Sequence, residues 1–247
     1  MENENLSMSA NRLDVEIQRR GLARSRSAAS DLIKRGKVTV NGAAAAKASM
    51  DISPDDAIAV AGDAAFVSRA GEKLAHALST FRIDARGLTA IDVGSSTGGF
   101  TDCLLRNGAE KVIAIDVGKG QLDQSLRSDP RVEAHEETDI RDFSTDSPAD
   151  IVVADLSFIS VGLALPKICE LVKKGGRAII LVKPQFEVGK EIADKYKGVV
   201  TDEAVRKSAL EKVVASAKES GFSFIAQTDS PIEGEKGNKE YLVLLKR

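Results

Sequence analysis

The chain has 247 residues, of which 43% are hydrophobic and 29% are charged, and its formal net charge is -2. This composition is typical of a globular protein, and it excludes a low-complexity chain or one that is basic throughout. Residues 1–10 have no apolar signal core, no apolar run approaches the length of a membrane-spanning helix, and the two cysteines form no CxxC pair. We therefore expect a cytoplasmic protein without a bound metal.

The first predicted domain spans residues 11–62 and follows a disordered segment at 1–10. Apolar residues at helical spacing predict a short helix that ends at Gly21 and a second helix from Arg26 to Arg35. A strand is predicted at Val38–Val40, followed by a tight hairpin turn at Asn41-Gly42, and a later strand is predicted at Ile58–Val60. These elements form a small α+β unit.

This unit is basic, with nine Lys and Arg against three Asp and Glu between Asn11 and Lys47. A basic face attracts phosphate backbones, although a solvated helix face gives the same charge pattern. The sequence from Arg12-Leu13-Asp14 through Gly21-Leu22-Ala23-Arg24-Ser25-Arg26 to Asn41-Gly42 closely resembles the small RNA-binding domain first known from a ribosomal protein. This resemblance implies contacts with structured RNA. The candidate RNA-binding residues are Arg12, Arg24, Arg26, Lys34, Arg35 and Lys37.

A linker is predicted at 63–70, and the second predicted domain spans 71–247. Its first helix is expected from Gly71 to about Arg82, after which strands and helices alternate. This alternation predicts a parallel sheet with helices on both faces. The predicted strands are Ala90–Val93, Lys111–Asp116, Ile151–Ala154, Arg177–Val182, Phe222–Thr228 and Glu240–Leu245, with a short extra strand at Val132–Ala134. The later helices are predicted at Phe100–Arg106, Leu163–Val172 and Asp202–Glu219.

Two connections in this domain carry further predictions. Residues 230–238 have no room for a crossover helix, so the last two strands should pair antiparallel. The polar stretch Gln185–Val200 has the length of a lid over a substrate, but an ordinary surface loop fits it equally well.

A glycine-rich turn, Asp92–Phe100, joins a predicted buried strand to a predicted helix. Such a turn lets a ligand approach the backbone and aims free N–H groups at it, so we expect a nucleotide-type cofactor here. The glycines lack the GxGxxG spacing of dinucleotide binders, which argues against a nicotinamide oxidoreductase. The carboxylate of Asp92 repels a pyrophosphate but suits the ammonium and sulfonium of S-adenosylmethionine.

Acidic residues after the next two strands extend the predicted cofactor site. Asp116 ends a strand, where a carboxylate can accept both ribose hydroxyls. Asp139-Ile140 follows the short extra strand, where the acid can meet an adenine amino group. A helix-capping role explains Asp139 equally well. The predicted cofactor-binding residues are Asp92, Gly94, Ser95, Ser96, Thr97, Gly98, Gly99, Phe100, Asp116, Asp139, Ile140 and Asp155.

Four charged residues are the candidate catalytic set: Lys73, Asp155, Lys183 and Glu240. Asp155 and Lys183 follow two predicted parallel strands, and ligands of open α/β sheets lie beyond the carboxyl ends of such strands. In this order, the four residues resemble the Lys-Asp-Lys-Glu tetrad of FtsJ-type ribose 2′-O-methyltransferases. Nearly the whole chain is similar to the TlyA-type family, some members of which are called haemolysins. The resemblance lies in the N-terminal domain and in the stretches Ser68–Leu74, Asp155–Ser160 and Val182–Glu187.

The resemblance implies a Rossmann-like S-adenosylmethionine-dependent methyltransferase sheet with an antiparallel last strand, beside the small α+β RNA-binding domain. It implies methylation of cytidine 2′-hydroxyls in ribosomal RNA, with ribosomal subunits as partners. Lys183 is the expected base, Asp155 would orient it, and Lys73 and Glu240 would position the ribose. A haemolysin and an RNA-binding protein without catalysis are the alternatives.

Overall fold

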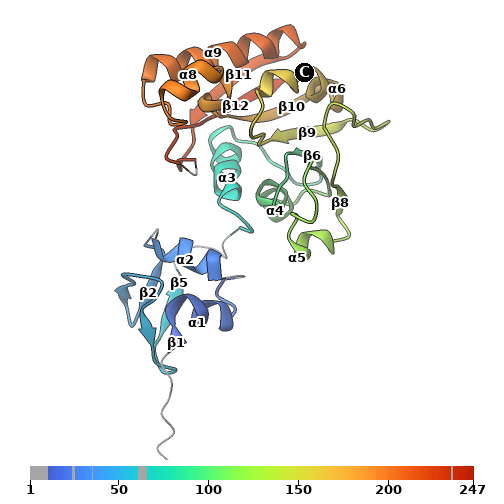
Figure 1. Ribbon diagram of the computed structural model, residues 1–247. Helices are drawn as coiled ribbons and strands as arrows, with labels where there is room; N and C mark the ends of the chain where they lie inside the picture. Colours follow the sequence, from blue (N-terminus) through green and yellow to red (C-terminus); the bar gives the residue numbers. More distant parts are fainter. Residues whose placement is uncertain (1–10, 24–25, 35, 61–65, 235) are drawn as a thin grey trace, which may run out of the picture. The chain divides into compact units, whose positions relative to one another are not determined.

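The computed structural model describes residues 11–23, 26–34, 36–60, 66–234 and 236–247. Contacts divide the chain into two compact units, Met1–Ala65 and Phe66–Arg247 (Figure 1). The sequence places a linker at 63–70, whereas Phe66 packs on the core of the large unit and Val67 N–H donates to Asp102 Oδ2 at 2.8 Å. Residues 63–65 and the segment 1–10 lie outside the described residues.

The small unit packs two helices against short strands. Its elements are β1 (Asn11–Arg12), α1 (Leu13–Arg19), α2 (Arg26–Lys34), β2 (Val38–Val40), β3 (Ala43–Ala44), β4 (Asp51–Ile52) and β5 (Ile58–Val60). Leu13 and Ile17 of α1 are buried with Leu32 of α2 because helical spacing brings them to the facing sides of the two helices. Asn41 and Gly42 have positive φ angles of 51° and 80°, which confirms the predicted hairpin turn.

Over the described residues, the large unit is a seven-stranded sheet with helices on both faces. The strands are β6 (Thr89–Val93), β7 (Lys111–Ile115), β8 (Val132–His135), β9 (Ala149–Ala154), β10 (Val172–Val182), β11 (Ser223–Asp229) and β12 (Tyr241–Lys246). The helices are α3 (Ala70–Thr80), α4 (Gly99–Arg106), α5 (Gln124–Arg127), η1 (Val161–Leu163, a 3-10 turn), α6 (Leu165–Leu171), α7 (Pro184–Glu187), α8 (Lys190–Lys195) and α9 (Glu203–Glu219).

The strand order is β11-β12-β10-β9-β6-β7-β8. The five strands β8, β7, β6, β9 and β10 run parallel to one another. Strand β12 runs antiparallel to both β10 and β11. This arrangement confirms the predicted fold class, the short extra strand and the antiparallel last pair. From β6 the chain continues to one side and then returns to the other, so the carboxyl ends of β6 and β9 form the switch point at which open α/β sheets bind their ligands.

Each face of the sheet has its own hydrophobic core. Leu74 of α3 and Leu104 of α4 pack with Ala90 on one face. The next residue of β6, Ile91, lies in the opposite core, which α6 and α9 cover. Successive side chains of a strand point to opposite faces, and both faces of this strand are buried. The result is a rigid platform whose strand ends hold the candidate residues.

The stretch Gln185–Val200 is not an irregular loop. It contains most of α7, which begins at Pro184 where a helix tolerates proline, and the whole of α8. The end of the stretch is fixed by Asn238, whose Oδ1 accepts from Val200 N–H at 2.9 Å and whose Nδ2 donates to the Gly198 carbonyl at 2.8 Å. A lid role for this stretch stays a prediction.

Candidate active site

Asp155 and Lys183 lie directly after two neighbouring parallel strands, β9 and β10. Lys183 Nζ is 2.6 Å from Asp155 Oδ1. The same amine donates a hydrogen bond of 2.6 Å to Ser157 Oγ. The side chains of Lys183 and Asp155 are 11% and 17% exposed, so this ion pair is shielded from water but not sealed.

A second ion pair joins α3 to the start of β12. Lys73 Nζ donates to Glu240 Oε2, and both side chains are buried. Gly234 is required beside this pair, because a Cβ there would lie 2.5 Å from Glu240 Oε1. Burying a charged lysine or carboxylate without a partner costs free energy of folding. Lys73 and Glu240 avoid this cost because each charge is matched by the other.

The register of β10 and β12 relates the two ion pairs. Val182 is paired with Tyr241 in the antiparallel ladder. Lys183 and Glu240 are the next residues on each side, so their backbones meet at the same end of the sheet. The structure therefore brings Asp155, Lys183 and Glu240 to adjacent strand ends, and the ion pair with Glu240 adds Lys73.

The glycine-rich turn after β6 differs in one respect from expectation. The N–H groups of Gly94 and Ser95 both donate to the Ile115 carbonyl, at 2.8 and 3.1 Å. The N–H of Ser96 donates to Asp116 Oδ2 at 2.8 Å. The expectation that these three amides are free for a ligand is therefore wrong. A turn whose amides are already bonded is a poor cradle for phosphates, and this favours a cofactor without them.

Three glycines of the turn are required by packing inside the protein. A Cβ on Gly98, whose φ is +93°, would lie 2.3 Å from Leu126 Cδ1. A Cβ on Gly99 would lie 2.2 Å from Ser68 Oγ. Gly94, whose φ is +80°, would place a Cβ 2.7 Å from the Asp155 carbonyl oxygen. The turn is thus pressed against β9's end, and Ser96 and Thr97 are its exposed residues.

Asp92 is fully buried at the end of β6. Its Oδ2 accepts from the N–H of Thr101 at 2.9 Å and from Thr101 Oγ1 at 2.7 Å, which fixes the first turn of α4. Its Oδ1 has no hydrogen-bond partner within the described part of the chain. Burial, reinforced by the nearby charge of Asp155, raises the pKa of Asp92 to about 7.

Asp116 follows β7 and lies against the same turn. Its two carboxylate oxygens accept from Ser96 N–H at 2.8 Å and from Gly118 N–H at 2.7 Å. These bonds hold the side chain at the carboxyl end of β7, next to the end of β6. The position is the one in which a carboxylate of an open α/β sheet can bind ribose hydroxyls.

Other predicted cofactor residues lie in less open places. Phe100 and Ile140 are 2% and 4% exposed and belong to the two hydrophobic cores, so their side chains serve packing. Asp139 accepts two hydrogen bonds from the Arg141 guanidinium, at 2.5 and 3.0 Å. That cation lowers the pKa of Asp139 to about 2. Asp139 therefore has a partner within the protein, as a structural residue would.

Three residues near Lys183 were not assigned roles from the sequence. Ser157 accepts the hydrogen bond from Lys183 described above. Phe158 is 88% exposed with a positive φ of 68°, and its ring lies 5.5 Å from that of Phe186. Glu187 accepts from Ser160 Oγ and from Val161 N–H, which fixes the loop after β9. In the sequence, all three residues lie in the stretches Asp155–Ser160 and Val182–Glu187 that carry the family resemblance, but that resemblance gave the individual side chains no role.

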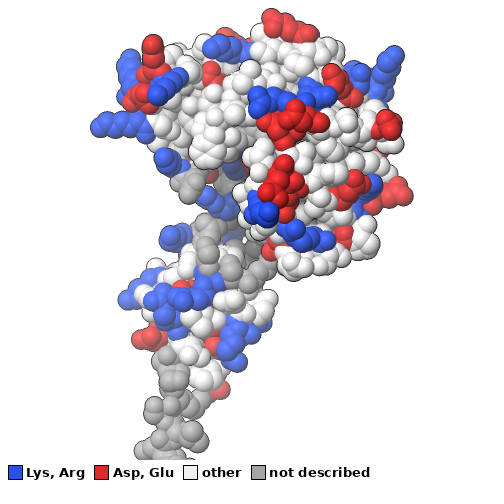
Figure 2. Space-filling view, turned by 45° about the vertical axis from the view of Figure 1, so that its right-hand side comes forward, with Lys and Arg blue, Asp and Glu red and all other residues white. Residues whose placement is uncertain are grey.

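The candidate RNA-binding residues lie on the small unit, where lysine and arginine dominate the face seen in Figure 2. Arg12, Arg26, Lys34 and Lys37 are exposed. Arg24 and Arg35 lie outside the described residues.

The large unit has a Rossmann-like sheet with an antiparallel last strand, an acid at the end of β6, another after β7, and two lysine–carboxylate pairs at the strand ends. These features define a methyltransferase, here joined to a basic module. The profile of the FtsJ-like methyltransferase family matches residues 66–247, and that of the S4 domain matches residues 11–58. The chain therefore belongs to the FtsJ-like methyltransferase family and carries an N-terminal S4 domain.

Known proteins are similar to this chain over nearly its whole length. A Mycobacterium tuberculosis protein named "16S/23S rRNA (cytidine-2'-O)-methyltransferase TlyA" is 43% identical over 95% of this chain and 89% of its own. A solved structure from Streptococcus thermophilus, provisionally named a hemolysin, is 37% identical with a TM-score of 0.74, over 98% of this chain and 90% of its own.

A more distant structure shares only the fold. The N-methyltransferase NodS of Bradyrhizobium japonicum, solved with S-adenosyl-L-homocysteine, is 15% identical with a TM-score of 0.52, over 71% of this chain and 87% of its own. Among the helices that the structure describes, none is both long and apolar enough to cross a membrane.

Proposed function

We propose that this protein transfers a methyl group from S-adenosylmethionine to ribose 2′-hydroxyls of ribosomal RNA, with cytidine as the target nucleoside. The observation that carries the proposal is the Lys183–Asp155 pair, held beside the turn that follows β6. The M. tuberculosis relative bears the name of this reaction. The S4 domain supplies a surface for structured RNA.

The residues around the turn fit S-adenosylmethionine. The donor carries a sulfonium and an ammonium but no phosphate, and the turn presents carboxylates where its amides are already bonded. Asp116 would bind the ribose hydroxyls of the donor. Ser96 and Thr97 would contact it from the exposed tip of the turn. When bound, the donor supplies an activated methyl group whose bonding electron pair leaves with sulfur.

Lys183 would act as the base. Its neutral amine takes the 2′-hydroxyl proton at Nζ while the ribose oxygen forms its bond to the methyl carbon. A neutral amine has two hydrogens and one lone pair. Ser157 Oγ accepts one hydrogen at 2.6 Å. Asp155 Oδ1 lies 2.6 Å from Nζ as an ion-pair partner and attracts the other N–H, so the two contacts restrict the direction of the lone pair.

The second ion pair and the exposed aromatic ring would place the ribose. Glu240 can accept a hydrogen bond from a ribose hydroxyl, and Lys73 can offset negative charge that develops on the reacting oxygen. The exposed ring of Phe158 offers a flat surface on which the target base can stack.

The test is to map ribose methylation in ribosomal RNA from cells with and without the gene. We expect 2′-O-methylcytidine at one or more positions to disappear with the gene and to return when purified protein and S-adenosylmethionine are added to the unmethylated RNA. An RNA-binding protein without catalysis predicts unchanged methylation, together with retained RNA binding and no binding of S-adenosylmethionine. Unchanged methylation in both experiments would end the proposal.

A further inference from the structure

Two carboxylates of the small unit are buried, although the unit is rich in exposed cations. Asp14 and Glu16, both on α1, are 3% and 2% exposed. Among the residues that the structure describes, each holds two arginines. They are two residues apart on a helix and therefore point to different sides of α1, which gives two separate clusters.

The Asp14 cluster keeps its cations open to the outside. Arg12 donates to both Asp14 oxygens, from Nε and Nη2, at 3.0 Å each, and Arg26 Nη2 donates to Oδ2 at 3.3 Å. The side chains of Arg12 and Arg26 are nevertheless 48% and 55% exposed. Each guanidinium thus uses part of its donor set on Asp14 and keeps the rest. Counted over the described residues, this cluster has two cations and one anion and is positive on balance.

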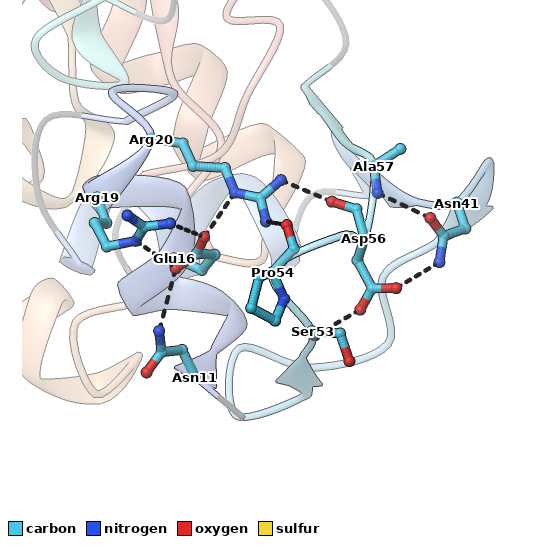
Figure 3. Close-up of polar contacts among 9 residues, drawn as sticks. All are labelled: Asn11, Glu16, Arg19, Arg20, Asn41, Ser53, Pro54, Asp56 and Ala57. Carbon is cyan, nitrogen blue, oxygen red and sulfur yellow. Dashed lines mark hydrogen bonds and ion pairs between the residues drawn. The ribbon is translucent and has the colours of Figure 1, made fainter. Parts of the chain in front are cut away.

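In the Glu16 cluster, Arg19 contacts the carboxylate and stays 63% exposed, whereas Arg20 is used inside the unit (Figure 3). Arg20 donates from Nε to Glu16 Oε1 at 2.7 Å, and from its two remaining nitrogens to the carbonyls of Asp56 and Pro54 at 2.7 and 2.9 Å. Asp56 in turn accepts from Asn41 Nδ2 at 2.8 Å. Arg20 is 24% exposed, and its hydrogen bonds tie α1 to the turn between β4 and β5. This cluster is a structural connection.

We propose that Asp14 is a positioning residue for RNA binding, and that it holds Arg12 and Arg26 as a preorganised pair for two phosphates of a structured RNA. The proposal rests on the RNA-binding role of the small unit. Long arginine side chains lose rotamer freedom when they bind a phosphate, and a buried carboxylate that already holds them removes part of that loss. The bidentate contact with Arg12 also fixes the plane of its guanidinium, and phosphate recognition depends on that plane.

The proposal predicts an effect opposite in sign to simple electrostatics. Removing the charge of Asp14 makes the small unit more positive, which alone would strengthen its attraction to RNA. If Asp14 instead organises the two arginines, its loss weakens binding in spite of the added positive charge. The sign of the change therefore separates the two explanations.

The experiment measures the affinity of the full-length protein for an in-vitro transcript of bacterial 23S ribosomal RNA over a range of salt concentrations. We expect Asp14→Asn to weaken binding about tenfold, the size expected from freeing two long side chains. The slope of affinity against salt should stay that of the wild type, because the same phosphates are contacted. Asp14→Glu keeps the charge but displaces the carboxylate, so it should also weaken binding.

Two controls are matched to the proposal. Asp55→Asn removes the same charge from an exposed position of the small unit and should leave binding unchanged or slightly tighter. Glu16→Gln alters the other buried carboxylate and should lower stability without changing the affinity of the folded protein. If affinity depends less steeply on salt concentration in Asp14→Asn than in the wild type, the small unit has unfolded in that variant. The affinity of Asp14→Glu then decides whether Asp14 positions the arginines or only lowers the positive charge.

The outcomes separate failure of this inference from failure of the proposed function. If Arg12→Ala and Arg26→Ala weaken binding while Asp14→Asn and Asp14→Glu bind as tightly as the wild type or more tightly, the positioning role is overturned. If none of these variants changes the affinity, this face of the small unit does not bind RNA, and that part of the proposed function fails as well.

Discussion

Both units of this protein hold cations with a shielded carboxylate at their candidate sites, but the cations at the two sites differ. In the small unit, Asp14 holds two arginines whose side chains are half exposed. In the large unit, Asp155 holds a lysine that is 11% exposed. An arginine stays charged at any physiological pH, so it suits a permanent contact with phosphate. A lysine can lose its proton, so it can become a base. The choice of cation therefore matches the proposed task of each unit.

The largest expected effect comes from Lys183. Lys183→Ala should lower methyl transfer at least about a thousandfold, because the base is removed. Lys183→Arg tests the comparison more sharply: it keeps a positive charge beside Asp155 but cannot accept a proton at working pH, so it should be as inactive as the alanine variant. Initial rates of methyl transfer measure this, with calorimetric binding of S-adenosylmethionine as the control. An active Lys183→Arg enzyme would exclude the lysine as base.

Asp92 gives an effect on stability that depends on pH. Burial raises its pKa from 3.8 to about 7 in the folded protein. Between about pH 4 and pH 7 the unfolded chain therefore binds fewer protons than the folded one, and the free energy of unfolding falls as pH rises, by up to about 1.4 kcal/mol per pH unit. Asp92→Asn should lack this decline.

Urea unfolding of both proteins between pH 5 and pH 9, without S-adenosylmethionine, measures the difference. The stability of the wild type relative to Asp92→Asn should drop until about pH 7 and then stay level. Parallel pH profiles for the two proteins would show that Asp92 is ionised throughout this range.

Phe158 should matter for activity but not for folding. Its ring is 88% exposed, so Phe158→Ala removes little buried surface and should leave the unfolding midpoint within error. Loss of one stacked base costs about 1–3 kcal/mol, so kcat/KM should fall about tenfold or more. Phe158→Tyr keeps a flat ring and should retain most of the activity. Equal activity of the alanine variant would remove the stacking role.

The smallest effect is expected at Arg20. Arg20→Ala removes hydrogen bonds to the carbonyls of Pro54 and Asp56, so amide hydrogen exchange in α1 and β5 should speed up about fivefold. Arg19→Ala is the matched control, since Arg19 contacts the same Glu16 but is 63% exposed. It should change exchange much less. Similar exchange in both variants would mean that Arg20 does not secure the turn between β4 and β5.

Much of the architecture could be predicted because it depends on neighbours along the chain. Successive residues of β6 enter opposite cores, and a strand buried on both faces is visible as an apolar run. Asp155 and Lys183 could be placed because each ends such a run. The two short helices between Pro184 and Lys195 were missed, since their sequence is polar and their start at a proline has no apolar period.

The site's finer features could not be predicted. The free amides expected in the turn after β6 are bonded to β7, and Phe100 and Ile140 of the predicted cofactor set lie in the cores. A pattern of residue types does not tell whether an amide has a partner or a ring is covered. Both depend on segments that are distant in sequence.

Apolar period and side-chain chemistry are local properties, so they predict the two-faced sheet, the basic N-terminal module and the types of residue at the strand ends. Which lysine pairs with which acid depends instead on contacts between distant segments of the folded chain. Lys73 meets Glu240 across 167 positions of the chain, and Ser157 becomes a partner of Lys183 only when β9 and β10 lie side by side. Phe158 is exposed and has a positive φ, and both properties depend on the path of the folded loop.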